Sequence, residues 1–377
     1  MIADRIQICV RLITLLALLT VVACAQRPKE APEIRTISPM EVFNPIKAVV
    51  HKDNYRDADK VYRVLALSSG GADGAFGAGV LRGWTQSNTR PEFDVVTGVS
   101  TGALMAVLAF LGPEYDPMLE EFYTSISSKD IFRKKGLAAF GSDSLYDYTP
   151  LKKQIESVVT EELIAKVAAE HAKGRRLYVA TTNLDAGELV IWDMGEIANG
   201  GRTDPLQHFQ KVLRASAAVP GFFPPVYIKP QRGIQLRQAH VDGGVKAPIL
   251  VSDAMFLSRQ KKRQLYMIVN GNTAKFNSSE PVSGKLADIA QKSISELMRE
   301  LMDDTIYRGY ASAVNSGMKF YMTSIPDSIL PSQKSLNFDT ARMRKLFNAG
   351  HKIGAAGLTT WKRQPPRLGK FEKIASR

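Results

Sequence analysis

Short apolar runs alternate along this chain with longer segments of helical periodicity. The apolar runs lie at 62–67, 93–96, 176–183 and 264–270, and the helical segments lie at 101–111, 148–172, 285–312 and 338–361. Apolar runs of this length are typical of strands buried on both faces, and a 3.6-residue period is typical of helices packed on a sheet. The pattern therefore predicts an α/β fold, in which a mostly parallel central sheet has helices on both faces.

A glycine-rich loop follows the first predicted strand and reads Ser68-Ser-Gly-Gly-Ala-Asp-Gly-Ala-Phe-Gly-Ala-Gly. Gly74 and Gly79 have the spacing of a phosphate-binding loop, but Val80 and Leu81 stand where that loop requires Lys and Ser/Thr. A nucleotide site is therefore not predicted. The remaining feature is a row of backbone N–H groups at a helix N-terminus, which binds an anion or an oxyanion.

A second turn, Gly98-Val-Ser-Thr-Gly, joins the apolar run 93–96 to the helical segment 101–111. On such a strand-turn-helix elbow the serine hydroxyl is raised at the helix N-terminus. Gly98 and Gly102 remove the Cβ atoms that would crowd the turn. Ser100 is thus the candidate nucleophile, although an ordinary strand-to-helix turn fits this short pattern too.

The beginning of the chain has the pattern of an export signal. Basic residues flank the front of the apolar stretch 12–22, which is too short to cross a bilayer as a helix. It ends in Val21-Val-Ala-Cys, which resembles the lipobox of bacterial lipoproteins and makes Cys24 the expected lipidation site. A plain secretory signal with an incidental cysteine is the alternative. By resemblance to lipoprotein sorting, Ala25 indicates the outer membrane of the bacterial cell envelope.

These features divide the chain into four expected parts. We expect a signal peptide at 1–23, a proline-containing tether at 24–60, one catalytic domain at 61–365 and a basic tail at 366–377. Removal of the signal would leave 354 residues, enough for a large core, and one cysteine, too few for an internal disulfide.

Composition narrows the class of partner. The chain is 45% hydrophobic and 23% charged, with a net charge of +13, of which +12 remains without the signal. A basic surface favours anionic partners, and for a lipid-anchored protein phospholipid headgroups are nearer than nucleic acid. The sequence contains no nucleic-acid motif beside these charges and no metal-ligand spacing, so we expect neither nucleic acid, nor a metal, nor another cofactor.

Four blocks together resemble the patatin-like phospholipase family. They begin at Leu67-Ser-Ser-Gly-Gly, Gly98-Val-Ser-Thr-Gly, Ala215-Ser-Ala-Ala-Val-Pro-Gly and Asp242-Gly-Gly, and they occur in the family's order. The resemblance implies a patatin fold and a lipid acyl hydrolase of the phospholipase A or esterase type, acting on membrane phospholipid or another acyl ester. It also implies a Ser-Asp dyad, with Ser100 as nucleophile and Asp242 as proton acceptor. By the same match Gly70 and Gly71 supply the oxyanion hole, and Gly243 and Gly244 complete the last block.

The glycine-rich loop departs from the family pattern at two positions. The family usually has Gly-Gly-Gly-x-Arg-Gly, whereas this chain has Ser69 and Asp73 at the first and fifth positions. Ser69 is a mild change because it still offers a backbone N–H. Asp73 places a carboxylate where the family has a cation, and a negative charge near a developing oxyanion opposes catalysis. Either the Asp73 side chain turns away, for example by accepting N–H groups at the helix start, or the site is weakened, and we favour the first.

Two other functions compete with this interpretation. One is a conventional α/β-hydrolase with a Ser-His-Asp triad, for which His351 is the only histidine downstream of Asp242. His240 precedes Asp242 by two residues and shares its strand face, so it is a candidate for orienting that carboxylate. The other is a non-catalytic envelope lipoprotein that retains the fold, and the observation that suggests it is Asp73 in the glycine-rich loop.

Overall fold

The computed structural model describes residues 60–366, apart from 137–140, 201–203, 230–236, 253–254, 256–259, 261, 274–281, 283, 285 and 330–335. The expected signal peptide, Cys24, and nearly all of the expected tether and basic tail lie outside the described residues. Within the described ranges, no helix combines the length and apolarity needed to cross a membrane.

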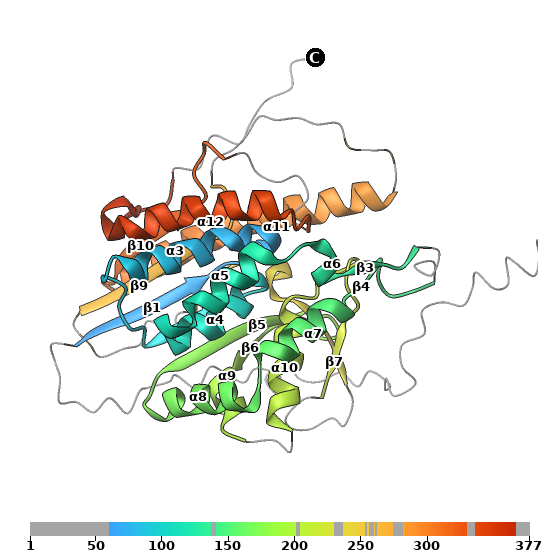
Figure 1. Ribbon diagram of the computed structural model, residues 1–377, viewed down its shortest axis with the longest axis horizontal. Coiled ribbons are helices and arrows are strands. Elements are labelled where there is room, and N and C mark those ends of the chain that lie inside the picture. Colours follow the sequence, from blue (N-terminus) through green and yellow to red (C-terminus); the bar gives the residue numbers. More distant parts are fainter. Residues whose placement is uncertain are drawn as a thin grey trace, which may run out of the picture.

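The described strands form a central sheet of eight strands and a separate small hairpin (Figure 1). The order in the sheet is β10-β9-β1-β2-β5-β8-β7, with β6 also paired to β5. The strands are β1 (Val61–Leu67), β2 (Val95–Gly98), β5 (Arg176–Asn183), β6 (Glu188–Asp193), β7 (Val226–Ile228), β8 (Gln238–Asp242), β9 (Lys262–Val269) and β10 (Lys319–Ser324), and the hairpin is β3 (Arg133–Lys134) with β4 (Tyr146–Asp147). Strands β10, β9, β1, β2 and β5 are parallel to one another. Strands β6 and β8 pair antiparallel with β5, and β7 pairs antiparallel with β8. The expected α/β fold with a mostly parallel sheet is confirmed.

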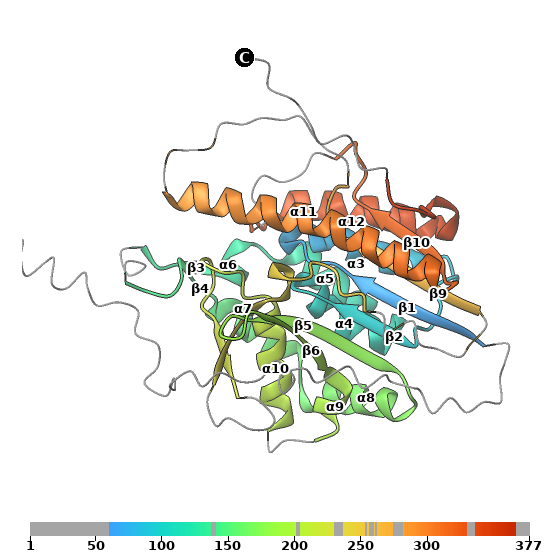
Figure 2. The same ribbon diagram turned by 180° about the vertical axis from the view of Figure 1, so that it is seen from behind.

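Helices cover both faces of this sheet. One face carries α3 (Gly74–Gln86), α4 (Thr101–Leu111), α5 (Asp116–Ser125), α7 (Thr149–Val158), α8 (Glu161–Ala172), α9 (Met194–Ala198), α10 (Pro205–Ser216) and α12 (Thr340–Ala355), with the short α6 (Ser128–Ile131) near the hairpin (Figure 1). The opposite face carries α11 (Leu286–Asn315) (Figure 2). Strand β1 shows why two layers form: Leu65 and Leu67 enter the first core, while Val64 and Ala66 enter the second.

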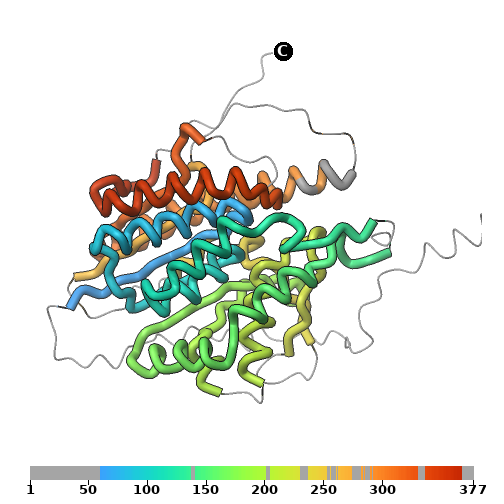
Figure 3. Tube along the Cα trace, in the orientation of Figure 1, coloured from blue at the N-terminus to red at the C-terminus, as the bar shows by residue number. Residues whose placement is uncertain are grey.

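Two helices far apart in the sequence lie side by side, namely α3 and α12 (Figure 3). Glycine allows this close approach, because a Cβ on Gly350 or Gly354 would stand 2.1 Å from a carbonyl oxygen of α3. The C-terminal helix is therefore part of the wall behind the glycine-rich loop, which begins α3.

The structure differs from the sequence expectations in detail. The single helical segment expected at 148–172 is two helices, α7 and α8, because the chain leaves the helical conformation at Val159 and Thr160. The Thr160 hydroxyl accepts the Leu163 N–H and caps α8. Helix α10 and strand β10 were not expected from the pattern.

Candidate active site

The candidate nucleophile, Ser100, lies in the turn between β2 and α4. Its backbone has φ 55° and ψ −124°, a conformation that L-residues rarely adopt. The flanking glycines are required, because a Cβ on Gly98 would stand 2.3 Å from the Gly102 carbonyl oxygen, and one on Gly102 would stand 2.5 Å from the Leu67 carbonyl oxygen. The sequence pattern thus produces a strained elbow that fixes the serine at the start of α4.

The candidate base, Asp242, is brought to Ser100 by strand β5. Gly98 at the end of β2 pairs with Val179 of β5, and Asp242 at the end of β8 pairs with Thr181. Both strands use the same edge of β5, since β6 occupies the other edge along these residues. Two residues of strand span only about 7 Å. The ends of β2 and β8 therefore meet, and the nucleophile and the carboxylate are neighbours.

The Asp242 carboxyl group is fully buried, and burial raises its pKa to about 7. The nearby Ser100 hydroxyl and the Gly244 N–H oppose this rise in pKa. The Gly244 N–H donates to Oδ1 at 2.7 Å, whereas Oδ2 has no hydrogen bond of good geometry to any described residue. Asp242 is therefore poised to titrate near neutral pH with one oxygen available.

The last residue of α10 and the residues that follow it fix the backbone of both Ser100 and Asp242. The Ser100 N–H donates to Ser216 Oγ at 3.0 Å, and the Ser216 hydroxyl in turn donates to the Ala180 carbonyl at 2.7 Å. The Asp242 N–H donates to the Ala218 carbonyl at 2.9 Å. Sequence analysis gave Ser216 no role, although it lies in the third family block. Its short polar side chain within an apolar run was the only available signal.

The glycine-rich loop presents free donors beside this pair. The N–H groups of Gly70, Gly71 and Ala72 donate to no acceptor in the described part of the chain. A Cβ on Gly70 would stand 2.2 Å from the Asn270 carbonyl oxygen, so only glycine fits there. Ser69, in contrast, donates its N–H to the Pro248 carbonyl at 2.7 Å. Ser69 thus has the expected backbone N–H, but this N–H is already bonded within the protein.

Asn270, at the end of β9, holds the loop in place and was missed by sequence analysis. Its side-chain amide donates to the Ser68 carbonyl at 2.9 Å, and its Oδ1 accepts the Gly77 N–H at 3.1 Å. A polar residue directly after the apolar strand was the signal that could have revealed it.

The Asp73 carboxylate pairs with a cation from the C-terminal helix. Arg342 of α12 contacts Asp73 Oδ1 at 3.1 Å, and the Asp73 side chain caps no N–H group. Burial raises the pKa of Asp73, and Arg342 opposes that rise. The expectation of local N–H partners was wrong, because the Asp73 carboxylate pairs with Arg342 instead. The ion pair offsets the negative charge that the loop carries where the family has a cation.

A family model matches about half of the chain, including both candidate residues. The model of the patatin-like phospholipase family matches residues 65–255, which contain all four blocks. The chain belongs to the patatin-like phospholipase family. The expected family is therefore confirmed, and membership is consistent with lipid hydrolase activity.

The chain is also similar to two known proteins. A cUMP-AMP-activated phospholipase of Escherichia coli is 44% identical over 69 residues, which are 18% of this chain and 21% of that protein. The matched part thus spans about one fifth of the relative's length. The crystal structure of VipD from Legionella pneumophila is similar with a TM-score of 0.40 and 14% identity, over 79% of this chain and 67% of that one.

The histidine of the alternative triad lies at the wrong end of α3. His351 Nε2 is 2.7 Å from the Gln86 side-chain oxygen at the C-terminal end of that helix. The N-terminal end lies against the elbow, since a Cβ on Gly74 would touch Thr101. The twelve residue steps from Gly74 to Gln86 span about 18 Å of helix. His351 is therefore not within reach of Ser100.

His240 is buried beside the candidate base but does not contact it through a hydrogen bond that the structure shows. Its Nδ1 is 2.9 Å from Thr181 Oγ1, and its ring lies against Trp192. Burial lowers the pKa of His240 to about 4, so the ring is neutral. Since Thr181 is also the register partner of Asp242, His240 supports the strand pair that carries the base.

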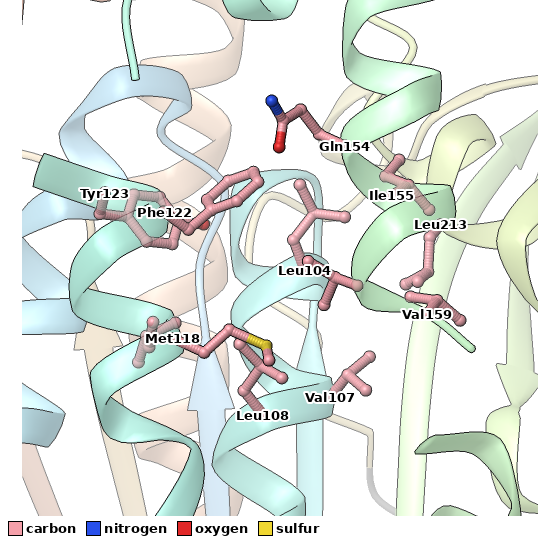
Figure 4. Close-up of a pocket in the computed structure, with 12 residues that line it drawn as sticks. Leu104, Val107, Leu108, Met118, Phe122, Tyr123, Gln154, Ile155, Val159 and Leu213 are labelled. Carbon is pink, nitrogen blue, oxygen red and sulfur yellow. The ribbon is translucent and has the colours of Figure 1, made fainter. Parts of the chain in front are cut away.

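An apolar pocket lies along α4 beyond the elbow (Figure 4). It is lined by side chains of α4, α5, α7 and α10, namely Leu104, Val107, Leu108, Met118, Leu119, Phe122, Tyr123, Gln154, Ile155, Val158, Val159 and Leu213. Its volume is about 30 Å³. A buried water needs roughly 10–15 Å³ of such volume, so the pocket has room for about two water molecules. We assign it to packing between helices.

The described residues contain no group of three or more His, Cys, Asp or Glu side chains placed to hold a metal ion.

Proposed function

We propose that this protein is a phospholipase A or esterase that cleaves carboxylic esters of membrane lipids through Ser100 and Asp242. One observation carries the proposal: β2 and β8 end at neighbouring positions on one edge of β5, and this brings a strained serine to a buried carboxylate. The raised pKa of Asp242 supports its role as a base, because a group that titrates near 7 both accepts and returns a proton at neutral pH.

The reaction would proceed in two halves. Asp242 takes the proton of the Ser100 hydroxyl while Oγ bonds to the ester carbonyl carbon, and the carbonyl oxygen becomes an oxyanion. The N–H groups of Gly70 and Gly71 stabilise that oxyanion. The carbon–oxygen bond to the alcohol then breaks, Asp242 returns the proton to the leaving alcohol, and acyl-Ser100 remains.

Water completes the cycle. Asp242 takes a proton from a water molecule, whose oxygen bonds to the acyl carbon of acyl-Ser100. The bond between that carbon and Ser100 Oγ breaks as Asp242 returns the proton to Oγ. The products are the free carboxylic acid and the original serine.

A direct assay tests this function. The purified full chain is incubated with phosphatidylcholine vesicles and, separately, with a short-chain nitrophenyl ester, and lysolipid, fatty acid and nitrophenol are measured. We expect hydrolysis of both, and none by Ser100→Ala. Activity on neither substrate would favour the non-catalytic envelope protein.

The triad alternative has its own test. Replacing His351 by Ala should leave most of the activity, because this side chain lies at the far end of α3 from Ser100. His240→Ala should cost up to about tenfold by disturbing the strand that positions Asp242. A loss at His351 as deep as that at Ser100 would instead establish the triad.

We also propose that the protein is held at the bacterial envelope through a lipidated Cys24, at the outer membrane. The lipobox-like Val21-Val-Ala-Cys supports this proposal. Each buried methylene is worth about 0.8 kcal/mol, so several acyl chains hold a protein firmly where charge alone does not. Metabolic labelling with a fatty acid should mark the parent chain, and Cys24→Ser should remove the label. A parent chain found wholly in the soluble periplasm contradicts the anchor.

A further inference from the structure

Helix α11 differs from the other long helices in where it extends. It crosses the sheet face opposite α12, and its N-terminal half continues past the end of α12 (Figure 2). The C-terminal half is anchored in the second core, where Ile306 and Ala313 are buried. In the N-terminal half, none of the side chains that the structure describes, 289–290 and 292–300, is buried, although large apolar ones are among them.

Four of these side chains form one continuous strip, which we call the apolar band. The band consists of Ile294, Leu297, Met298 and Leu301, which are three or four residues apart and so adjoin on the helix surface. Leu297 is 71% exposed, the highest value of any large apolar side chain among the described residues. Leaving this side chain in water is unfavourable, so the band is a candidate contact surface.

One end of the apolar band reaches the turn that carries the candidate base. Met298 Cε stands 2.6 Å from the place that a Cβ on Gly244 would take, and the Asp242 Oδ1 atom is 3.0 Å from the same point. The apolar band thus runs along the helix from Met298, beside the catalytic turn, to the exposed Leu297.

We propose that the apolar band inserts into the acyl region of a lipid bilayer and guides the ester from the bilayer to Ser100. This inference rests on the proposed function. The continuity with the catalytic turn favours a bilayer over a protein partner, because the proposed substrate has its acyl chains in the bilayer. A protein partner seated on the band would instead keep lipid away from the side of α11 that reaches the catalytic turn.

The charges of α11 indicate what kind of membrane contact this is. Positions 286–304 contain two basic residues and five acidic ones. Both basic side chains, Lys292 and Arg299, pair with Glu296. The contact therefore depends on apolar burial and not on attraction to anionic headgroups, so it should persist on zwitterionic vesicles and at high salt.

A fluorescence experiment tests the contact directly. Leu297→Trp in the full chain is mixed with vesicles of phosphatidylcholine brominated on its acyl chains, which quench indole inside the bilayer. Val314→Trp is the matched control, since Val314 is 52% exposed on the same helix but outside the band. We expect added quenching at 297, none at 314, and no reduction in 1 M salt. Equal quenching at both positions, or none at 297, would overturn the proposal, and none at 297 is the outcome expected of a protein-binding surface.

A kinetic experiment separates this inference from the proposed function. Leu297→Asp should lower the ratio of phosphatidylcholine vesicle hydrolysis to soluble nitrophenyl ester hydrolysis by about tenfold or more, because a charge replaces an apolar side chain in the bilayer. Val314→Asp should leave the ratio unchanged. An unchanged ratio for Leu297→Asp contradicts the inference but not the proposed hydrolase function. If the parent chain itself does not hydrolyse the soluble ester, the proposed hydrolase function is contradicted instead.

Discussion

Ser100 and Asp242 are neighbours, yet the fold holds them in high-energy states of two different kinds. Ser100 is held in a strained backbone conformation, with φ 55° and ψ −124°. Asp242 has an ordinary strand-end backbone, but its carboxyl group is fully buried. The nucleophile thus stores backbone strain, whereas the base stores the cost of removing a charge from water.

This difference explains why the strain at Ser100 can be predicted from the neighbouring sequence, whereas the burial of Asp242 cannot. Strain at Ser100 follows from contacts among residues 98–102 and the neighbouring strand β1, so the short glycine pattern signals it. Desolvation of Asp242 depends on everything packed around it, including α11 and the segment after α10. Backbone strain and desolvation both lower the stability of the folded protein, but only desolvation of a carboxylate depends on pH. Substitutions at the two residues should therefore change stability in distinguishable ways.

The largest effect is expected on turnover and should be the same for both residues. Ser100→Ala and Asp242→Asn should each lower kcat by about a thousandfold or more. The serine is unreactive without a base to take its proton, and the base has no function without the serine. Steady-state kinetics with a soluble nitrophenyl ester measures this. If Asp242→Asn kept most of the parent activity, Asp242 would not be the base.

Stability should separate the two residues. The pKa of Asp242 is raised in the folded protein from 3.8 to about 7, so folding favours its protonated form. The stability that this gives is fully present below about pH 4 and is lost as the pH rises through about 7. Asn stays neutral, so Asp242→Asn should raise the free energy of unfolding above pH 7 by about 2–4 kcal/mol and leave it nearly unchanged at pH 4. Denaturant unfolding at both pH values measures this, and a gain that is independent of pH would argue against desolvation.

The pH dependence of activity should report the same group. Because Asp242 must be ionised to accept a proton, kcat/KM should fall about tenfold per unit below a pH of about 7 and level off above it. The profile is measured with a soluble ester, and His240→Ala serves as control, since the pKa of His240 lies near 4. A midpoint that moved with the His240 substitution would assign the profile to that ring.

The strain at Ser100 predicts a smaller effect that does not depend on pH. Glycine adopts positive φ without strain, so Ser100→Gly should raise the free energy of unfolding by about 1 kcal/mol while abolishing activity. Ser100→Ala keeps the Cβ and the strain, and it is the matched control. Equal stability of the two variants would show that the elbow stores no strain.

The smallest effect on kcat is expected at Asp73, which lies in the glycine-rich loop and is not part of the Ser100–Asp242 pair. Its carboxylate is already compensated by Arg342, so Asp73→Asn should change kcat by less than about tenfold. Arg342→Gln removes the compensation and should therefore be the more harmful change of the two. A large rise in kcat for Asp73→Asn would show that the charge opposes the reaction despite the ion pair.

The sequence alone determined the features that depend on local geometry and order. Apolar runs between amphipathic segments gave the α/β sheet, because burial on both faces demands that pattern. The elbow at Gly98 to Gly102 was readable because its steric requirement lies within five residues. The four ordered blocks indicated the family and named Ser100 and Asp242.

Tertiary structure decided everything that depends on partners distant in the chain. It paired Asp73 with Arg342 of α12, and it bonded the Ser69 N–H to the Pro248 carbonyl. It also brought β2 and β8 to one edge of β5. It also raised the pKa of Asp242 and placed Met298 of α11 against the catalytic turn. These properties arise from packing between segments tens to hundreds of residues apart. Burial and long-range hydrogen bonds are set by that packing, and no short window of sequence contains it.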